Sequence, residues 1–248
     1  MKYIALFTFG WIATALPSPA LAQDNEAEKL FRGMEKKLLA AKAFEITFDY
    51  QVEKRKAKGE LLVTQDNKLR LKVVGHFTEK PKAGFELISD GKQVKTKGAK
   101  FFVASNGRPG IEPGGQSEWQ APKKFHATLG GIVSRAGMWY TIFLMPYLQG
   151  SAGDIDLDDK GSRMNAYDFK LAGMEKVGTK DAKVIRFRFG DGGSGKDNAD
   201  ITLWIDVNTL LPLKRTFVLE GGPIHIVENY HEFRLDPKVD AKAFVLPK

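Results

Sequence analysis

A glycine-rich segment, Gly190-x-x-x-x-Gly195-Lys196, is a place where the chain could bind phosphate, because its spacing approaches that of a P-loop. A P-loop needs Ser or Thr after the lysine to hold magnesium, and a following helix whose N-terminus meets the phosphate. Here Asp197 stands after the lysine, and a strand-like sequence follows. We therefore interpret the segment as a hairpin loop.

Four aspartates, Asp154, Asp156, Asp158 and Asp159, have a spacing close to that of a calcium-binding loop. That motif needs glycine at its sixth position and glutamate at its twelfth. Asp159 and Asn165 occupy those positions. We interpret this segment as an acidic turn exposed to solvent.

The four histidines, His76, His126, His225 and His231, are scattered and lack the paired spacing of metal ligands. The chain has no cysteine and no G-x-S-x-G nucleophile motif. We therefore predict no catalytic residue, no metal site and no cofactor, although a hydrolase with an unrecognised site stays open. The basic clusters lack the interleaved aromatic residues of a nucleic-acid groove, so we expect no nucleic-acid partner.

The N-terminus, residues 1–22, has the features of a secretory signal peptide. Lys2 precedes an apolar run that is broken by Pro17 and Pro19, and Ala20-Leu21-Ala22 is an A-x-A cleavage site. Cleavage after Ala22 would release a periplasmic protein, residues 23–248. An uncleaved membrane anchor is the alternative, but the apolar run is short for a membrane span. The net charge of +8 suits either contact with anionic lipid headgroups or simple solubility.

The elements that must position any site are mainly strands. A helix is predicted over 27–43, and from Phe44 the apolar residues recur with period two, as in a half-buried strand. Lys54–Gly59 is predicted to be a charged turn. Similar patterns predict strands at 60–64, 69–73, 85–89, 94–97 and 101–104, and then at 167–171, 182–189, 199–206, 211–219 and 224–235.

The segment 105–148 interrupts this pattern. Residues 105–122 are rich in Gly, Pro and Ser and are predicted to form a long loop. Residues 124–148 are apolar and helical in pattern, but Arg135 and several glycines argue against a transmembrane helix. An apolar helix must bury its surface, so we expect it to cover the sheet or a ligand.

The fold class that follows is mainly β (α+β). We predict a curved antiparallel unclosed β-barrel with an N-terminal helix and an inserted helical lid. Residues 23–248 would form one domain, in which 105–148 is the loop and lid insertion.

The hairpin over 202–218 also points to a family. Its sequence Leu203-Trp-Ile-Asp-x-x-Thr-x-Leu-Pro-x-Lys214 resembles a signature of the bacterial outer-membrane lipoprotein carriers, the LolA-like proteins. Supporting segments follow in the family's order: Gly59–Val63, Asn67–Arg70, Ser89–Lys92 and Phe244–Pro247. The resemblance implies an unclosed β-barrel whose apolar concave face is lidded by helices and carries acyl chains. Similar folds also serve as lipid-binding lipoproteins and as periplasmic stress sensors.

Two departures from the family pattern bear on function. Asp66-Asn67-Lys68 stands where carriers have Arg-Pro, an arginine that the family links to passing cargo onward; Arg70 is the nearest arginine. The segment 105–148 is also longer and more apolar than in typical carriers.

These observations predict a periplasmic, non-catalytic binding or carrier protein for acyl lipids or lipoproteins. Its partners would include an envelope transporter or receptor, with transient contact to a membrane surface. A protein-interaction or envelope-sensor module on the same fold is the alternative. Arg70 is predicted to meet a lipid headgroup, and each apolar site residue could equally be ordinary core. The predicted cavity residues are Phe44, Ile46, Phe48, Leu69, Leu71, Phe187, Leu203 and Phe217, covered by Trp139, Ile142 and Phe143.

Overall fold

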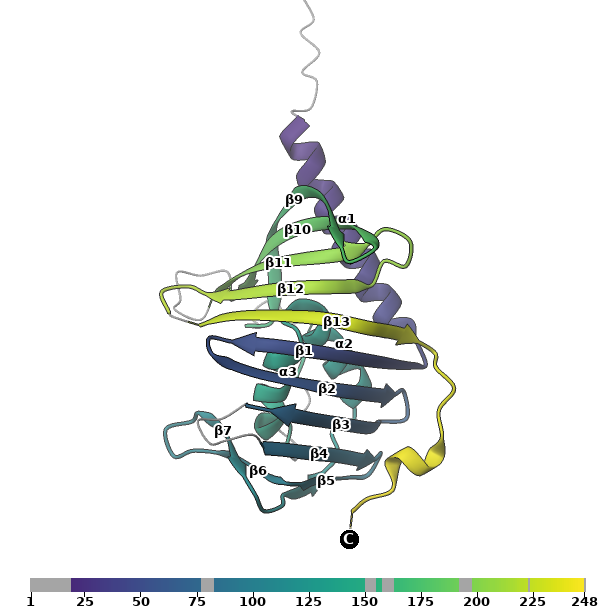
Figure 1. Ribbon diagram of the computed structural model, residues 1–248, viewed down its shortest axis with the longest axis vertical. Helices are drawn as coiled ribbons and strands as arrows, with labels where there is room; N and C mark the ends of the chain where they lie inside the picture. Colours follow the sequence, from purple (N-terminus) through teal and green to yellow (C-terminus); the bar gives the residue numbers. More distant parts are fainter. Residues whose placement is uncertain are drawn as a thin grey trace, which may run out of the picture.

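One large antiparallel sheet dominates the computed structural model, which describes residues 19–76, 83–149, 155–157, 163–191, 198–222 and 224–247 (Figure 1). Its eleven strands have the order β8-β5-β4-β3-β2-β1-β13-β12-β11-β10-β9. In the described residues β8 and β9 are the edge strands, so the sheet is not closed. The predicted unclosed, mainly β fold is confirmed.

The strands are β1 (Ala43–Val52), β2 (Arg55–Thr64), β3 (Lys68–Gly75), β4 (Ala83–Asp90), β5 (Gln93–Lys97), β6 (Ala99–Val103), β7 (Pro109–Pro113), β8 (Glu118–Gln120), β9 (Asn165–Val177), β10 (Lys180–Gly190), β11 (Ala199–Asp206), β12 (Pro212–Leu219) and β13 (His225–Leu235). The helices are α1 (Pro19–Ala40), α2 (Phe125–Arg135) and α3 (Met138–Leu144), with short 3-10 helices η1 (Met145–Leu148) and η3 (Ala241–Phe244).

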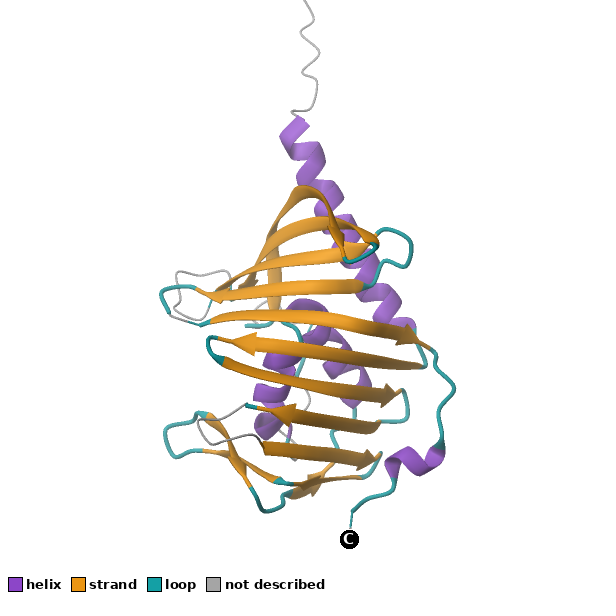
Figure 2. Cartoon of the chain, in the orientation of Figure 1, coloured by secondary structure: helices purple, strands orange, loops and turns teal. Residues whose placement is uncertain are grey.

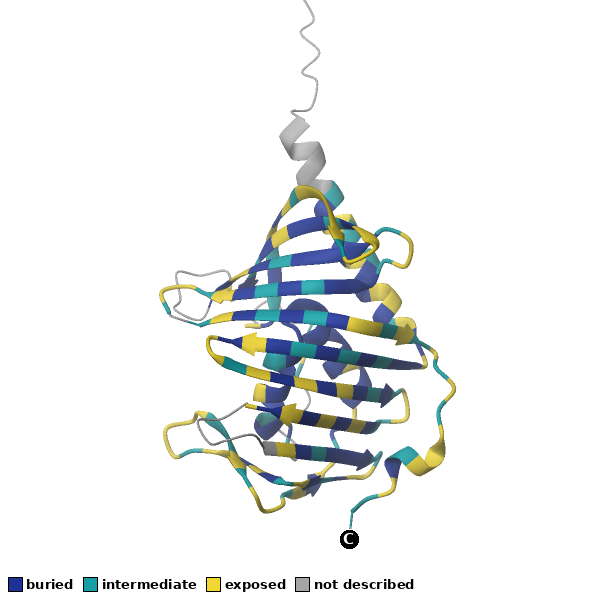
Figure 3. Cartoon of the chain, in the orientation of Figure 1, coloured by how far each residue is buried: buried dark blue, intermediate teal, exposed yellow. Residues whose placement is uncertain are grey.

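The two faces of the sheet differ in character, and burial alternates along most of its strands (Figure 3). In β3, Leu69, Leu71 and Val73 are fully buried, whereas Arg70 and Lys72 are exposed. This alternation is the period of two that strand geometry imposes. We call the buried side of the sheet the inner face and the charged side the outer face.

The helices α1, α2 and α3 all lie on the inner face (Figure 2). α1 covers the end near β9, where the Phe31 ring lies 5.0 Å from Phe169 and 4.9 Å from Phe187. α2 and α3 lie behind the middle of the sheet (Figure 1). Between β4 and β8, Phe101 of β6 packs edge-on against Phe85 at 5.2 Å.

The turns follow from local side-chain chemistry. Asp206 accepts hydrogen bonds from the backbone N–H groups of Asn208 and Thr209 at 2.8 and 3.1 Å, and so closes the β11–β12 hairpin. Asp90 accepts from Lys92 and Gln93 in the same way at 2.8 and 2.9 Å. The hairpin predicted over 202–218 is confirmed, and the predicted strands 85–89 and 94–97 are joined as a second hairpin.

Three boundaries differ from the predictions. The first helix begins at Pro19, ahead of residue 27, and the expected charged turn at 54–59 is wrong because β2 already begins at Arg55. Within the expected loop 105–122, β7 pairs with β6 and β8 pairs with β5. Cross-strand hydrogen bonding therefore orders a segment whose composition alone favours a loop.

Residues 1–18 lie outside the described residues, so the signal peptide and its cleavage after Ala22 stay predictions. No helix in the described part of the chain has the length and apolar character that a membrane span requires.

Candidate functional site

The predicted cavity residues come together on the inner face as one apolar surface. All eight strand residues named above are at most 5% exposed and belong to a single hydrophobic cluster. The strand register brings these side chains together, because Phe44 pairs with Val63 and Ile46 pairs with Leu61. Neighbouring inward positions form rows across the strands. The side chains of the helices fill the space over these rows.

The lid residues divide into two groups. Ile142 is 1% exposed and belongs to the same cluster, and the half-buried Trp139 stacks at an angle against Tyr50, with 4.9 Å between ring centroids. Phe143, in contrast, is 40% exposed, and its ring centroid lies 6.4 Å from that of Tyr140. Tyr140, which was not predicted, lies 5.4 Å from Phe189 and 6.0 Å from Phe217.

Arg215 holds the C-terminal end of α2. This fully buried side chain donates hydrogen bonds to the carbonyl oxygens of Val133, Ser134 and Arg135 at 2.8, 2.7 and 2.6 Å. These carbonyls have no partner within the helix, and they carry the negative end of its dipole. A guanidinium therefore satisfies both their hydrogen bonding and their partial charge.

Glu228 holds the N-terminal end of α3. Its carboxylate accepts from the N–H groups of Met138 and Trp139 at 3.0 and 2.5 Å, where the helix dipole favours a negative charge. The Tyr230 hydroxyl also donates to Glu228. Burial, with the adjacent Glu228 charge as a smaller cause, raises the pKa of Tyr230 well above its ordinary value.

Tyr50, Glu228 and Arg215 form one row across β1, β13 and β12, since Tyr50 pairs with Glu228 and Glu228 pairs with Arg215. We call this row the polar clamp. It lies beneath Gly137, the residue between α2 and α3. Gly137 has φ = +91°, and a Cβ there would lie 2.3 Å from Glu228 Oε2 and 2.9 Å from Arg215 Cδ. The clamp thus fixes the break between the two lid helices.

Two polar atoms of the clamp have no hydrogen-bond partner among the described residues. They are Tyr50 Oη and Arg215 Nε. Burial, followed by the charge of Glu228, raises the pKa of Tyr50, so this phenol stays neutral and can donate a hydrogen bond. The inner face therefore combines a large apolar surface with a few unsatisfied polar groups.

A second buried network ties α2 to α1. Arg135 Nε lies 2.7 Å from Glu35 Oε1, and Ser134 Oγ donates to the same oxygen at 2.9 Å. Arg135 also donates to the carbonyl oxygens of Leu157 and Met164 at 2.8 and 3.2 Å. The lid is therefore connected to α1 and to the chain that leads into β9.

Arg70, the residue predicted to meet a lipid headgroup, does not lie with the apolar residues of the inner face. It lies on the outer face, opposite in direction to its neighbours Leu69 and Leu71, and pairs with Glu86 at 2.7 Å.

The sequence analysis missed Arg215 and Glu228, although a signal was present. Arg215 shares the inward parity of Phe217, and Glu228 shares that of Ile226 and Tyr230. A charged residue at an inward position of a strand pattern indicates a buried polar network.

No group of three or more potential metal-ligating side chains occurs within the described ranges. Most of the P-loop-like segment, at 192–197, lies outside these ranges, as do Asp154, Asp158 and Asp159. The flanking strands β10 and β11 are antiparallel neighbours, as the hairpin interpretation requires.

No protein-family model and no curated protein matches the chain. Similar solved structures include a chain of the MucA/MucB complex from Pseudomonas aeruginosa, with 15% identity and a TM-score of 0.45 over 90% of this chain. The present chain spans only 61% of that chain. LprF from Mycobacterium bovis has 11% identity and a TM-score of 0.46, over 87% of this chain and 95% of LprF.

A putative outer membrane lipoprotein-sorting protein domain from Vibrio parahaemolyticus is also similar, with 9% identity and a TM-score of 0.37 over 89% of this chain and 97% of that one. The similar structures thus include the class of protein that the sequence resembles. All three TM-scores lie below 0.5.

Proposed function

We propose that the protein is an exported, non-catalytic binding or carrier protein for an acyl lipid or a lipid-modified protein. The observation that carries the proposal is the inner face, on which strands from both halves of the chain expose one apolar surface to a separate pair of lid helices. The helices α2 and α3 could move away from the inner face without breaking the hydrogen bonds between the strands.

An acyl chain would take the place of α3 side chains over the inner face. Each buried methylene contributes about 0.8 kcal/mol, so several methylenes can offset the apolar contacts that the lid gives up. The polar clamp would lie at the end of this path, where Tyr50 and Arg215 offer hydrogen-bond donors to an ester or phosphate oxygen.

Binding of a pyrene-labelled phospholipid tests the proposal. Phe143→Glu places a charge on the lid, and Val218→Glu is a matched control, since both side chains are 40% exposed and Val218 lies on the outer face. We expect Phe143→Glu to weaken binding about tenfold or more, because a charge next to an acyl chain loses hydration. Val218→Glu should bind like the wild type.

Hydrogen exchange supplies a second readout, because lipid uptake should change protection in α2 and α3 while β1 to β3 keep theirs. A folded protein that takes up no acyl lipid would contradict the proposal and favour the protein-interaction module.

A further inference from the structure

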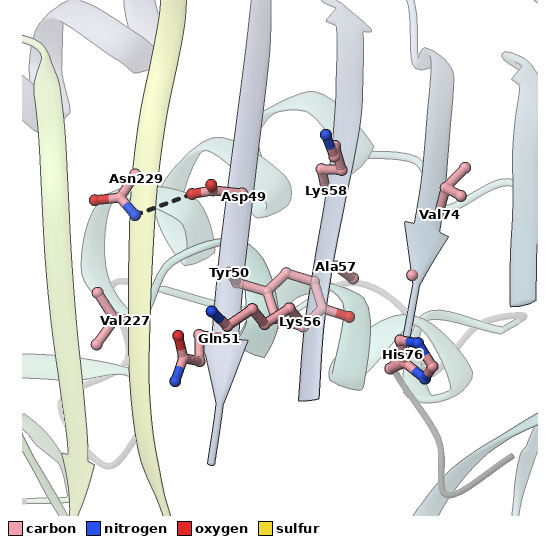
Figure 4. Close-up of a pocket in the computed structure, with 11 residues that line it drawn as sticks. Asp49, Tyr50, Gln51, Lys56, Ala57, Lys58, Val74, His76, Val227 and Asn229 are labelled. Atoms are coloured by element: carbon pink, nitrogen blue, oxygen red, sulfur yellow. Dashed lines mark hydrogen bonds between the residues drawn. The ribbon is translucent and has the colours of Figure 1, made fainter. Parts of the chain in front are cut away.

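The outer face of the sheet contains an open hollow of about 590 Å³ that the acyl-binding proposal does not use. It spans β13, β1, β2 and β3 near the β1–β2 turn (Figure 4). The sheet separates it from the lid, and Tyr50 is the one residue that lines the hollow and also belongs to the polar clamp. Its lining residues are Asp49, Tyr50, Gln51, Lys56, Ala57, Lys58, Val74, Gly75, His76, Val227 and Asn229.

Strand register arranges the lining side chains in two rows. One row runs Asn229, Asp49, Lys58 and Val74 across four strands. The other runs Val227, Gln51 and Lys56, and His76 follows because its N–H donates to the Lys56 carbonyl at 2.8 Å. Figure 4 shows Lys56, Lys58 and His76 among the residues that line the hollow. Two lysines and one histidine thus lie around one hollow.

Several cations of the outer face are already engaged in ion pairs. Arg70 pairs with Glu86, Lys95 pairs with Glu118, and Arg234 pairs with Glu45. Lys56 and Lys58 have no ion pair with any residue in the described ranges. Their positive charge is therefore available to an external anion.

The one carboxylate in the hollow is already engaged. Asp49 accepts a hydrogen bond from Asn229 Nδ2 at 3.0 Å and lies 3.4 Å from His231 Nε2. It forms no ion pair with Lys56 or Lys58. A second hollow of about 150 Å³ adjoins the first, shares Lys58 and Val74, and adds Lys72 and Glu60.

We propose that this outer hollow binds a phosphate group, either from a lipid headgroup at a membrane surface or from a soluble phosphate ester. Lysine binds phosphate as a point charge, and the neighbouring amide of Gln51 can donate to its oxygens. The volume accommodates a phosphate together with a glycerol or sugar unit. Binding should weaken with added salt, because the site is open to solvent.

The test compares two double variants that remove the same charge. Lys56→Ala/Lys58→Ala alters the hollow, whereas Lys97→Ala/Lys238→Ala removes two exposed lysines elsewhere. Inorganic phosphate is titrated by amide NMR, and vesicles of phosphatidylcholine with or without phosphatidylglycerol are co-sedimented with the protein. We expect phosphate shifts at 49–51, 56–58 and 74–76, and a loss of affinity of roughly 30-fold in the first variant only.

Each outcome has a defined meaning. A parallel loss of vesicle binding in the first variant identifies a lipid headgroup as the source, and phosphate binding without vesicle binding identifies a soluble ester. The absence of shifts in these rows, or an equal loss in both double variants, overturns the proposal. The titration with inorganic phosphate contains no acyl lipid, so its outcome does not depend on binding at the inner face and the two proposals can fail separately.

Discussion

At the scale of single residues, Arg215 is the side chain on which the lid most depends. Its guanidinium is fully buried, and the carbonyl oxygens that it contacts all belong to the last turn of α2. Removing one member of a buried polar network leaves the others without partners. Such losses are large compared with the total stability of a domain.

We therefore expect Arg215→Met to lower the free energy of unfolding by about 3–5 kcal/mol, since it leaves three buried carbonyls without their donor and removes the positive charge on the strand next to Glu228. Urea unfolding measures this change. Arg186→Met, on the outer face of the same sheet, is the control and should cost less than about 0.5 kcal/mol. Equal stability of the two variants would show that the clamp does not hold the lid.

His126 gives the protein a pH dependence. Burial lowers the pKa of His126 below its ordinary value of 6.5, although the Ala41 backbone and the Asp236 charge act in the opposite direction. As the pH falls below 6.5, the unfolded chain therefore binds a proton at this site before the folded protein does. The stability that neutral His126 provides is present above pH 6.5 and is lost as the pH falls toward the lower folded pKa.

His126→Gln removes this titration. We expect unfolding experiments on either side of pH 6.5 to show a smaller loss of stability on acidification in the variant than in the wild type. A loss of equal size in both proteins would contradict the assignment.

At the scale of elements, the break between α2 and α3 is the decisive feature of the lid. Gly137 has a positive φ and no room for a Cβ, whereas Gly173 in β9 has φ = +112° with nothing within 4 Å. An alanine at Gly173 would meet backbone strain alone, whereas an alanine at Gly137 would meet both backbone strain and a steric clash.

We expect Gly173→Ala to cost about 1 kcal/mol through the backbone alone. Gly137→Ala should cost at least about 2 kcal/mol, because its methyl group must displace Glu228 or Arg215. Thermal or urea unfolding measures both, and a Gly137→Ala cost no larger than that of Gly173→Ala would contradict the packing described here.

Element boundaries show how far the sequence alone leads. The predicted strand 199–206 coincides with β11, because alternating side chains with one buried face encode their own register. β7 was missed because Pro109–Pro113 has no alternation and is ordered by pairing with β6. That the apolar strand residues share the inner face could be predicted from parity. The polar clamp depends on which strands become neighbours, and no local pattern specifies that.

At the scale of the whole molecule, the two faces of one sheet have separate tasks. The inner face gathers apolar side chains from β1 to β3 and from β10 to β13 under a lid that is tied down by buried polar groups. The outer face is charged, and its hollow contains Lys56 and Lys58, which have no ion pair with any residue in the described ranges. The proposed carrier would thus hold acyl chains on one side and meet phosphate on the other.

Native mass spectrometry with lipid extraction, on the protein purified from its own envelope, tests the central claim most directly. We expect a phospholipid or an acylated peptide to co-purify with the wild type and with Val218→Glu, and to be lost from Phe143→Glu. A folded wild-type protein with a ligand-free mass, and with no lipid taken up on titration, would contradict the account.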